Sequence, residues 1–341
     1  MHIPLDISIK LIYNIHCDRI FIQKKRCEMV KVFVVGSAGS TGLRLAERLS
    51  RRPDVKLLQY DESIQRKEPE EVRQLMQLSD FTFLCLPDDA AREIVNLAEG
   101  TGTRILDAST AHRTEDSFSY GFPELTKKHR QDIETANFVS VPGCHASGFI
   151  ALVYPLIAAG IVSNSAPFSC SSITGYSGGG NMMIAEYENP GRNAEMDSPM
   201  LYAMGQGHKH MPEIVKHCGL EYPPVFMPIV ANFHSGILVS VALHAQILAG
   251  RASLTDIREV LKEHYNGCKF VKVSNADESP ASLYAGALSG RDDMEIYVSG
   301  TDECILLSAR FDNLGKGSSG AAVQCFNIMC GIPEDTGLFV M

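Results

Sequence analysis

The sequence lacks three features that mark common classes of protein. It has no basic stripe, and its formal charge of −9 argues against a nucleic-acid-binding surface. It has no run of about 18 apolar residues, so no membrane-spanning helix is expected. It also has no internal repeat and no low-complexity tract. The 341 residues, of which 45% are hydrophobic and 21% charged, predict one large or two medium globular domains.

The ten cysteines are scattered singly, with no CxxC pair, and no secretory signal precedes the first apolar strand. This pattern is typical of unpaired thiols in a reducing compartment, and we expect a cytoplasmic protein. Residues 1–28 fit poorly with the regular pattern that begins at Met29. Their acidic residues argue against a transit peptide, so we expect an extension with little fixed structure.

From Met29 onward, short apolar runs alternate with helical patterns. The helical spacing covers residues 40–50, 69–78 and 89–98, and the apolar runs lie at 30–35, 55–60, 81–86, 103–108 and 137–141. This alternation predicts an α/β fold in which residues 29–145 form a Rossmann-like, doubly wound parallel sheet that binds a dinucleotide.

The pattern changes beyond residue 160. The apolar runs at 225–233, 236–248 and 303–313 alternate partly with period two, and 255–265 is an amphipathic helix. We therefore expect a substrate-binding α+β domain with a mixed sheet over residues 146–313. The final segment, 314–341, contains a predicted helix opened by a Gly/Ser-rich turn.

A glycine turn joins the first predicted strand to the first helix. Gly36, Gly39 and Gly42 in GSAGSTG form a GxxGxxG variant of the dinucleotide-binding fingerprint. Glycines at such a turn let the backbone approach a pyrophosphate, whose charge the helix N-terminus favours. The alternative is a turn that only packs the helix on the strand.

The residues after the second strand give conflicting signals about the nucleotide. Asp61 lies about where an acidic residue binds the adenosine ribose of NAD. Arg66 and Lys67 come next and are suited to the 2′-phosphate of NADP. These residues alone do not decide between NAD and NADP.

Cys144 in VPGCHASGF follows a Pro-Gly turn and opens a helical stretch over 145–160. A thiol at a helix N-terminus has a lowered pKa, which favours a catalytic thiolate. The position is also at the carboxyl edge of the predicted sheet, where open α/β folds bind ligands. The alternative is an inert packed cysteine.

A thiolate nucleophile needs an acid or base partner, and GHKHMPEI (207–214) offers His208 and His210. On an extended segment these two histidines point in opposite directions, so at most one should face a given ligand. A zinc site lacks a clear third ligand, and we expect no metal. Arg113 is a candidate for gripping a phosphate or carboxylate, and its alternative is a surface salt bridge. The glycine cluster TGYSGGG (174–180) either brings backbone amides close to an anion or is a flexible loop.

Taken together, these motifs resemble those of the N-acetyl-gamma-glutamyl-phosphate reductases, in their shorter form, which are related to aspartate-semialdehyde dehydrogenases. The resemblance runs from about Met29 to the C-terminus. It rests on seven motifs in family order: GSAGSTGLRL (36–45), DASTAHR (107–113), YGFPEL (120–125), VPGCHAS (141–147), TGYSGGG, GHKHMPEI and DNLGKGSSGAAVQ (312–324).

The resemblance implies a chemistry for the candidate residues. Cys144 would attack N-acetyl-L-glutamyl 5-phosphate to give a thioester, which NADPH would reduce to N-acetyl-L-glutamate 5-semialdehyde, a step of arginine biosynthesis. His210 would be the acid/base and His208 would bind substrate, although this order can be reversed. Arg113 would bind the phosphate.

The resemblance also implies the cofactor contacts and the assembly. The last helix would pack on the first domain, and the protein would be a homodimer or homotetramer without a nucleic-acid or membrane partner. The implied NADP-binding residues are Gly36, Ser37, Ala38, Gly39, Ser40, Thr41, Gly42, Ser177, Gly178, Gly179 and Asn313.

The residues leave three alternatives to this function. The nearest is a sister enzyme acting on aspartyl phosphate. A cysteine hydrolase or acyltransferase using Cys144 and His210 would leave the glycine turn unexplained. A nucleotide-binding sensor without catalysis would leave the thiol without a role.

Overall fold

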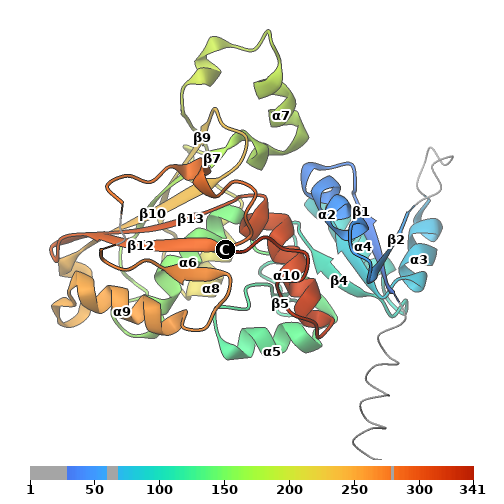
Figure 1. Ribbon diagram of the computed structural model, residues 1–341, viewed down its shortest axis with the longest axis horizontal. Helices are drawn as coiled ribbons and strands as arrows, with labels where there is room; N and C mark the ends of the chain where they lie inside the picture. The colour runs from blue at the N-terminus through green and yellow to red at the C-terminus, as the bar shows by residue number, and fades with distance from the viewer. Residues whose placement is uncertain (1–28, 60–67, 278–279) are drawn as a thin grey trace, which may run out of the picture.

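The computed structural model describes residues 29–59, 68–277 and 280–341 and contains two β-sheets, seen in Figure 1 with α10 (Gly320–Met329) between them. The expected N-terminal extension lies outside the described residues, as do Asp61, Arg66 and Lys67. No helix in the described ranges is long and apolar enough to cross a membrane.

The first sheet has six strands in the order β2-β1-β3-β4-β6-β5, and every pair is parallel. This confirms the predicted doubly wound sheet. The strands are β1 (Val30–Val35), β2 (Val55–Leu58), β3 (Phe81–Leu84), β4 (Arg104–Asp107), β5 (Ser119–Tyr120) and β6 (Phe138–Ser140). The helices that alternate with them are α2 (Ser40–Ser50), α3 (Pro69–Leu78), α4 (Asp88–Leu97) and α5 (Lys127–Thr135).

Both faces of this sheet are covered, which explains its continuous apolar strands. Successive residues of β1 point to opposite faces: Val32 and Val34 join a core with α2 and α10, whereas Phe33 and Val35 join a core with α3 and α4. A period-two pattern is therefore absent from β1, and only its length and flanking glycine identify it as a strand.

The second sheet has seven strands in the order β11-β12-β13-β10-β7-β9-β8. Pairs β7/β9 and β11/β12 are parallel and the others antiparallel, which confirms the expected mixed sheet. The sequence analysis identified β9, β10 and β13 but not the other four. The strands are β7 (Ser169–Gly175), β8 (Met200–Leu201), β9 (Val225–Ala231), β10 (Ile237–His244), β11 (Val271–Val273), β12 (Met294–Gly300) and β13 (Cys304–Phe311).

The helices of this half lie mainly on one face of the sheet. α6 (Cys144–Ala158) packs against β10 and β13, α9 (Leu254–His264) packs against β11 and β12, and α8 (Met211–Cys218) packs on α6. α7 (Gly180–Glu188) instead projects beyond the sheet, at the top of Figure 1. The core of this half is built on α6, which is buried along almost its whole length.

The chain returns to the first sheet at its end. A π-helical turn, η6 (Gly315–Ser319), leads into α10, whose Phe326 meets Phe81 edge-on at a centroid distance of 5.0 Å. Arg52 Nη1 donates to Asn327 Oδ1 and ties α10 to the end of α2. The domain boundaries expected at 145/146 and 313/314 stay a prediction.

Candidate active site

The candidate residues from both halves of the chain meet at one cavity of about 410 Å³. The carboxyl end of the parallel sheet, the start of α6 and the turn before α8 all contribute to it. The predicted site residues among its lining are Ser40, Thr41, Arg113, Cys144, Ser177, Gly178, Gly179, His208, His210 and Asn313.

Cys144 is the first residue of α6, as its motif predicts. Gly317 of η6 lies against it, because a Cβ on Gly317 would sit only 2.8 Å from the Cys144 Cβ. The expected lowering of its pKa is wrong. Burial raises the pKa of the Cys144 thiol above its usual value, and the opposing effects of Arg113, the His145 N–H and Lys209 do not outweigh it. The thiol therefore needs a base to become a nucleophile.

His210 and His208 both line the cavity, which corrects the expectation that an extended segment separates them. The chain turns at His210, whose φ/ψ of −88°/−4° is helical, and its N–H donates to His208 Nδ1 at 3.2 Å. The two rings lie 4.8 Å apart and nearly perpendicular. Burial lowers the pKa of His208 to about 4 and that of His210 well below its usual value. Both imidazoles are therefore neutral at pH 7 and can accept a proton.

His210 reaches the start of α6 because residue 143 is a glycine. A Cβ on Gly143 would lie 2.6 Å from His210 Nε2 and 2.4 Å from Arg113 Nη1, so any other residue there would displace both groups. His210 Nδ1 is buried and has no hydrogen-bond partner among the described residues.

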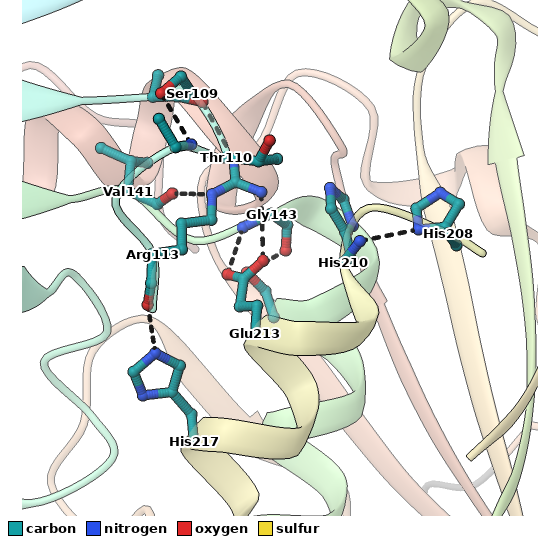
Figure 2. A network of polar contacts seen from close by, with 12 residues as sticks. Ser109, Thr110, Arg113, Val141, Gly143, His208, His210, Glu213 and His217 are labelled. Carbon is teal, nitrogen blue, oxygen red and sulfur yellow. Dashed lines mark hydrogen bonds and ion pairs between the residues drawn. The ribbon is translucent and has the colours of Figure 1, made fainter. Parts of the chain in front are cut away.

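Arg113 is buried rather than part of a surface salt bridge, with 7% of its surface exposed. Its Nε donates to the Val141 carbonyl at 2.9 Å and its Nη2 to the Ala108 carbonyl at 3.0 Å. Its Nη1 pairs with Glu213 Oε2 at 3.2 Å, as Figure 2 shows. These contacts hold the guanidinium beside Gly143 at the rim of the cavity.

Glu213 was missed by the sequence analysis. It lies on the first turn of α8, and its Oε1 accepts hydrogen bonds from Gly143 N at 2.8 Å and Tyr120 Oη at 2.7 Å (Figure 2). One carboxylate thus fixes the turn before Cys144 and the orientation of Arg113. The available signal was its spacing of three residues from His210, which puts both on one side of the helix start.

His145 follows Cys144 directly, and the sequence motif alone predicts no role for it. It is buried and lines the cavity; its Nδ1 is 2.6 Å from Ser172 Oγ and its Nε2 is 3.0 Å from Tyr202 Oη. Burial lowers the pKa of His145 to about 3. Its ring therefore orients the Tyr202 hydroxyl and carries no charge at pH 7.

The glycine turn has the tight geometry that its sequence predicts. Gly36 has φ +85°, and a Cβ there would lie 2.3 Å from the Cys85 carbonyl oxygen. A Cβ on Gly42 would lie 2.2 Å from the Gly36 carbonyl oxygen, whereas Gly39 has room for one. Two of the three glycines are thus required for the helix to start directly above the strand. Ser40 and Thr41, at that helix start, reach the cavity.

The second glycine cluster lies beside the first. Asn181 Nδ2 donates to the Ala38 carbonyl at 2.8 Å, which links the start of α7 to the turn after β1. Asn313 accepts from Gly236 N at 2.8 Å and donates through Nδ2 to Ser177 Oγ at 3.1 Å. Ser177, Gly178 and Gly179 line the cavity next to Asn313. No group of three or more His, Cys, Asp or Glu residues that could hold a metal ion occurs in the described part of the chain.

Two family models match the chain. Residues 31–134 match the NAD binding domain of semialdehyde dehydrogenases, and residues 144–313 match their dimerisation domain. Among solved structures, aspartate semialdehyde dehydrogenase II of Vibrio cholerae, complexed with ASA, covers 89% of this chain and 99% of its own at a TM-score of 0.67 and 15% identity. The enzyme of Candida albicans, solved with NADP, has a TM-score of 0.62 over 89% of this chain and 99% of its own at 16% identity. The fold is that of the semialdehyde dehydrogenases.

The curated relatives place the chain in a narrower family among the proteins with this fold. N-acetyl-gamma-glutamyl-phosphate reductase 2 of a Nostoc species is 43% identical over 320 residues, which is 90% of this chain and 99% of that protein. The corresponding reductase 2 of Pseudomonas putida is 40% identical over 310 residues, covering 90% and 98%. The chain belongs to the N-acetyl-gamma-glutamyl-phosphate reductase family.

Proposed function

We propose that the protein reduces N-acetyl-L-glutamyl 5-phosphate to N-acetyl-L-glutamate 5-semialdehyde with NADPH, releasing phosphate, in arginine biosynthesis. The identity with the named reductases over about 90% of the chain supports this activity. The thiol at the start of α6, facing a cavity beside a dinucleotide-type glycine turn, supports the thioester route.

The choice of substrate rests on the charges of the residues that line the cavity. Its described lining residues include Arg113, whose guanidinium is already paired with Glu213, and the cation Lys209, but no aspartate or glutamate. The proposed substrate has two anionic ends, a phosphate and a carboxylate, and its nitrogen is a neutral amide. Aspartyl phosphate carries an ammonium group, which would find no carboxylate partner among these residues. The cavity therefore favours the N-acylated acyl phosphate.

The reaction begins with proton transfer from the Cys144 thiol to neutral His210. The thiolate attacks the acyl carbon, a thioester forms on Cys144, and the departing phosphate takes the proton back from His210. Bound NADPH would supply the hydride for the thioester carbonyl. Reduction would release the aldehyde and leave Cys144 as a thiolate, which is a good leaving group, and one proton taken up from solvent would restore the thiol. Arg113 would neutralise the leaving phosphate.

The residues present fit a dinucleotide at this site. Gly36 and Gly42 carry no Cβ where the turn is tightest, Ser40 and Thr41 line the cavity, and the N-terminus of α2 offers partial positive charge to a pyrophosphate. Asn313 and the cavity-lining residues Ser177 to Gly179 would hold the nicotinamide end. The preference for NADP over NAD rests on the family, because Asp61, Arg66 and Lys67 lie outside the described residues.

The substrate assignment predicts a clear preference in the reverse reaction. With phosphate present, N-acetylglutamate semialdehyde should give a kcat/KM at least about 100-fold higher than aspartate semialdehyde, because the latter's ammonium would face Lys209 and Arg113. Absorbance of the reduced nucleotide measures this, with NAD and NADP run in parallel. The opposite preference, or no turnover with either aldehyde, would refute the proposal.

We also propose a cytoplasmic homodimer or homotetramer joined through the outer face of the second sheet. The register across the sheet places Met227, Ser171, Ser240 and Ser308 on one face, opposite the helices. Leu306 shares that face, and both it and Met227 are exposed. Apolar side chains on a sheet face without a helix are typical of a subunit interface.

The interface makes a prediction about assembly. M227E or L306E should shift the protein to monomers, since a buried carboxylate without a partner opposes association. Light scattering after gel filtration measures the mass. L78E, which places the same charge on a more exposed leucine at the end of α3, is the control and should leave the assembly unchanged. Intact oligomers of both sheet variants would contradict this interface.

A further inference from the structure

A lysine is buried next to the active site without a part in the proposed chemistry. Lys316 is 2% exposed, and its Nζ donates to Glu124 Oε1 at 2.7 Å and to Gln324 Oε1 at 2.6 Å. Nζ also lies 5.1 Å from the centre of the Phe122 ring and 5.3 Å from that of Phe270. The ammonium group is therefore held from several sides in an apolar enclosure.

Its partner Glu124 comes from a distant part of the chain, the YGFPEL motif, and is also buried, with 7% exposed. Glu124 Oε1 accepts a second hydrogen bond from Gln324 Nε2 at 2.7 Å, and Oε2 has no partner among the described residues. Two of the motifs that carry the family resemblance thus meet in this pair. Neither motif received a catalytic role.

The pair lies at the turn that touches the nucleophile. Lys316 belongs to η6, the π-helical turn, and the next residue, Gly317, lies against Cys144. Ser318 Oγ is 3.1 Å from Thr41 Oγ1 on the first turn of α2. Of three consecutive residues of η6, Lys316 is half of the ion pair, Gly317 lies against the Cβ of Cys144, and Ser318 contacts the proposed cofactor turn.

The opposite side of η6 is also fixed by close packing. A Cβ on Gly315 would lie 2.1 Å from the Arg291 carbonyl oxygen, and one on Gly320 would lie 2.3 Å from Asp292 Oδ1. π-helical turns are rare and concentrate at functional sites, because their extra residue must be stabilised by tertiary contacts. Away from these glycines, the side chains of η6 that supply such contacts are Lys316 and Ser318.

We propose that the Lys316–Glu124 pair is a positioning device, which holds η6 so that Gly317 shields Cys144 and Ser318 stays beside Thr41. A buried ion pair adds little stability compared with apolar residues of the same volume, but its geometry specifies one arrangement. The role of the pair in turnover rests on the proposed function. Its effect on the thiol does not, because that can be measured without substrate.

The test compares K316M with the double variant K316M/E124M. The single variant leaves Glu124 buried without its cation and should melt at a lower temperature, whereas the double variant should recover the melting temperature because no unpaired charge remains. In both, we expect kcat to fall about 100-fold with KM within about threefold, since a small displacement of reacting groups has this effect.

The substrate-free measurement is alkylation of Cys144 by iodoacetamide as a function of pH, followed by mass spectrometry of its peptide. Loosening η6 should admit water to the thiol, so the midpoint for Cys144 should move to lower pH in both variants while kcat falls. R258M, which removes a buried cation that donates to the Val298 carbonyl from α9, away from the cavity, is the control and should change neither quantity.

A double variant that recovers both kcat and the alkylation midpoint together with its melting temperature would overturn the proposal, because the pair would then act only through stability. If the double variant does not fold, E124Q tests the proposal instead, through kcat and the pH midpoint of Cys144 alkylation. It keeps an oxygen acceptor but removes the charge. If the wild-type protein shows no turnover, the proposed function is refuted. The pH dependence of Cys144 alkylation in the variants then still tests the role of the Lys316–Glu124 pair.

Discussion

Replacing Cys144 by serine is expected to lower kcat by at least about 10⁴-fold, the largest effect of any single substitution in this protein. The hydroxyl of serine ionises far less readily than a thiol, and His210, whose pKa lies well below its usual value, is too weak a base to compensate. An ester is also a poorer hydride acceptor than a thioester. Both halves of the reaction therefore fail together.

The measurement is steady-state turnover of C144S in the reductive direction, with C304S as the control, because Cys304 is exposed and remote from the cavity. C304S should retain wild-type kcat. Alkylation adds a second check: because burial raises the pKa of Cys144, its reaction with iodoacetamide should increase with pH up to a midpoint above that of an ordinary thiol. A C144S kcat within tenfold of wild type would exclude a thioester intermediate.

The sequence was sufficient for the parallel sheet because its strands and helices are local patterns. The runs at 30–35 and 81–86 became β1 and β3, and the helical spacing at 69–78 matches the bounds of α3. The glycine turn was recognisable for the same reason, since Gly36 and Gly42 are needed by a contact between neighbouring elements. The motif order then brought Cys144, His210 and Arg113 to one cavity.

The missed residues are those whose partners are distant in sequence. Glu213 accepts from Gly143 N across 70 residues, and Lys316 reaches Glu124 across 192. Such contacts leave no periodicity in the chain. Tyr202 likewise gave no signal, because the short strand β8 before it has both residues exposed and its pairing with β9 is set by the fold.

The error about the thiol has a physical reason. The turn before Cys144 predicts that this residue begins a helix. A helix dipole stabilises a charged group at its end by only a fraction of a kcal/mol to about 2 kcal/mol. Desolvation of a buried thiolate can exceed this, and its extent depends on what covers the site. Gly317, which lies 173 positions later in the chain, is part of that cover. No pattern around residue 144 contains this information.

Replacing each of the two histidines by asparagine should change different kinetic constants. H210N should lower kcat by about 10³-fold, within the range for losing a general acid/base, with little change in KM. H208N should raise KM about tenfold and change kcat much less, the loss expected for one substrate hydrogen bond. Asparagine at 208 can still accept a hydrogen bond from the His210 N–H, which keeps the turn before α8 comparable in the two variants.

The reason for assigning the proton transfer to His210 is its environment. It is the more buried of the two rings, it lies beside Gly143 and Arg113, and its Nδ1 has no partner in the described structure. His208 Nδ1 is already occupied by the His210 N–H, which leaves only Nε2 for a ligand. Because burial puts the pKa of His210 well below its usual value, it stays neutral, and able to accept the thiol proton, at pH values where an ordinary histidine is already protonated.

The pH profile then distinguishes the two roles. Protonation of His210 removes the base, so the acid limb of the wild-type kcat/KM should lie below the pH at which an ordinary histidine protonates. This acid limb should persist in H208N and disappear in H210N, because asparagine does not titrate. Stopped assays from pH 4.5 to 9 in a constant-ionic-strength buffer would show it. If H208N instead loses the limb and most of kcat, His208 is the acid/base, and the two histidines have exchanged the roles assigned to them.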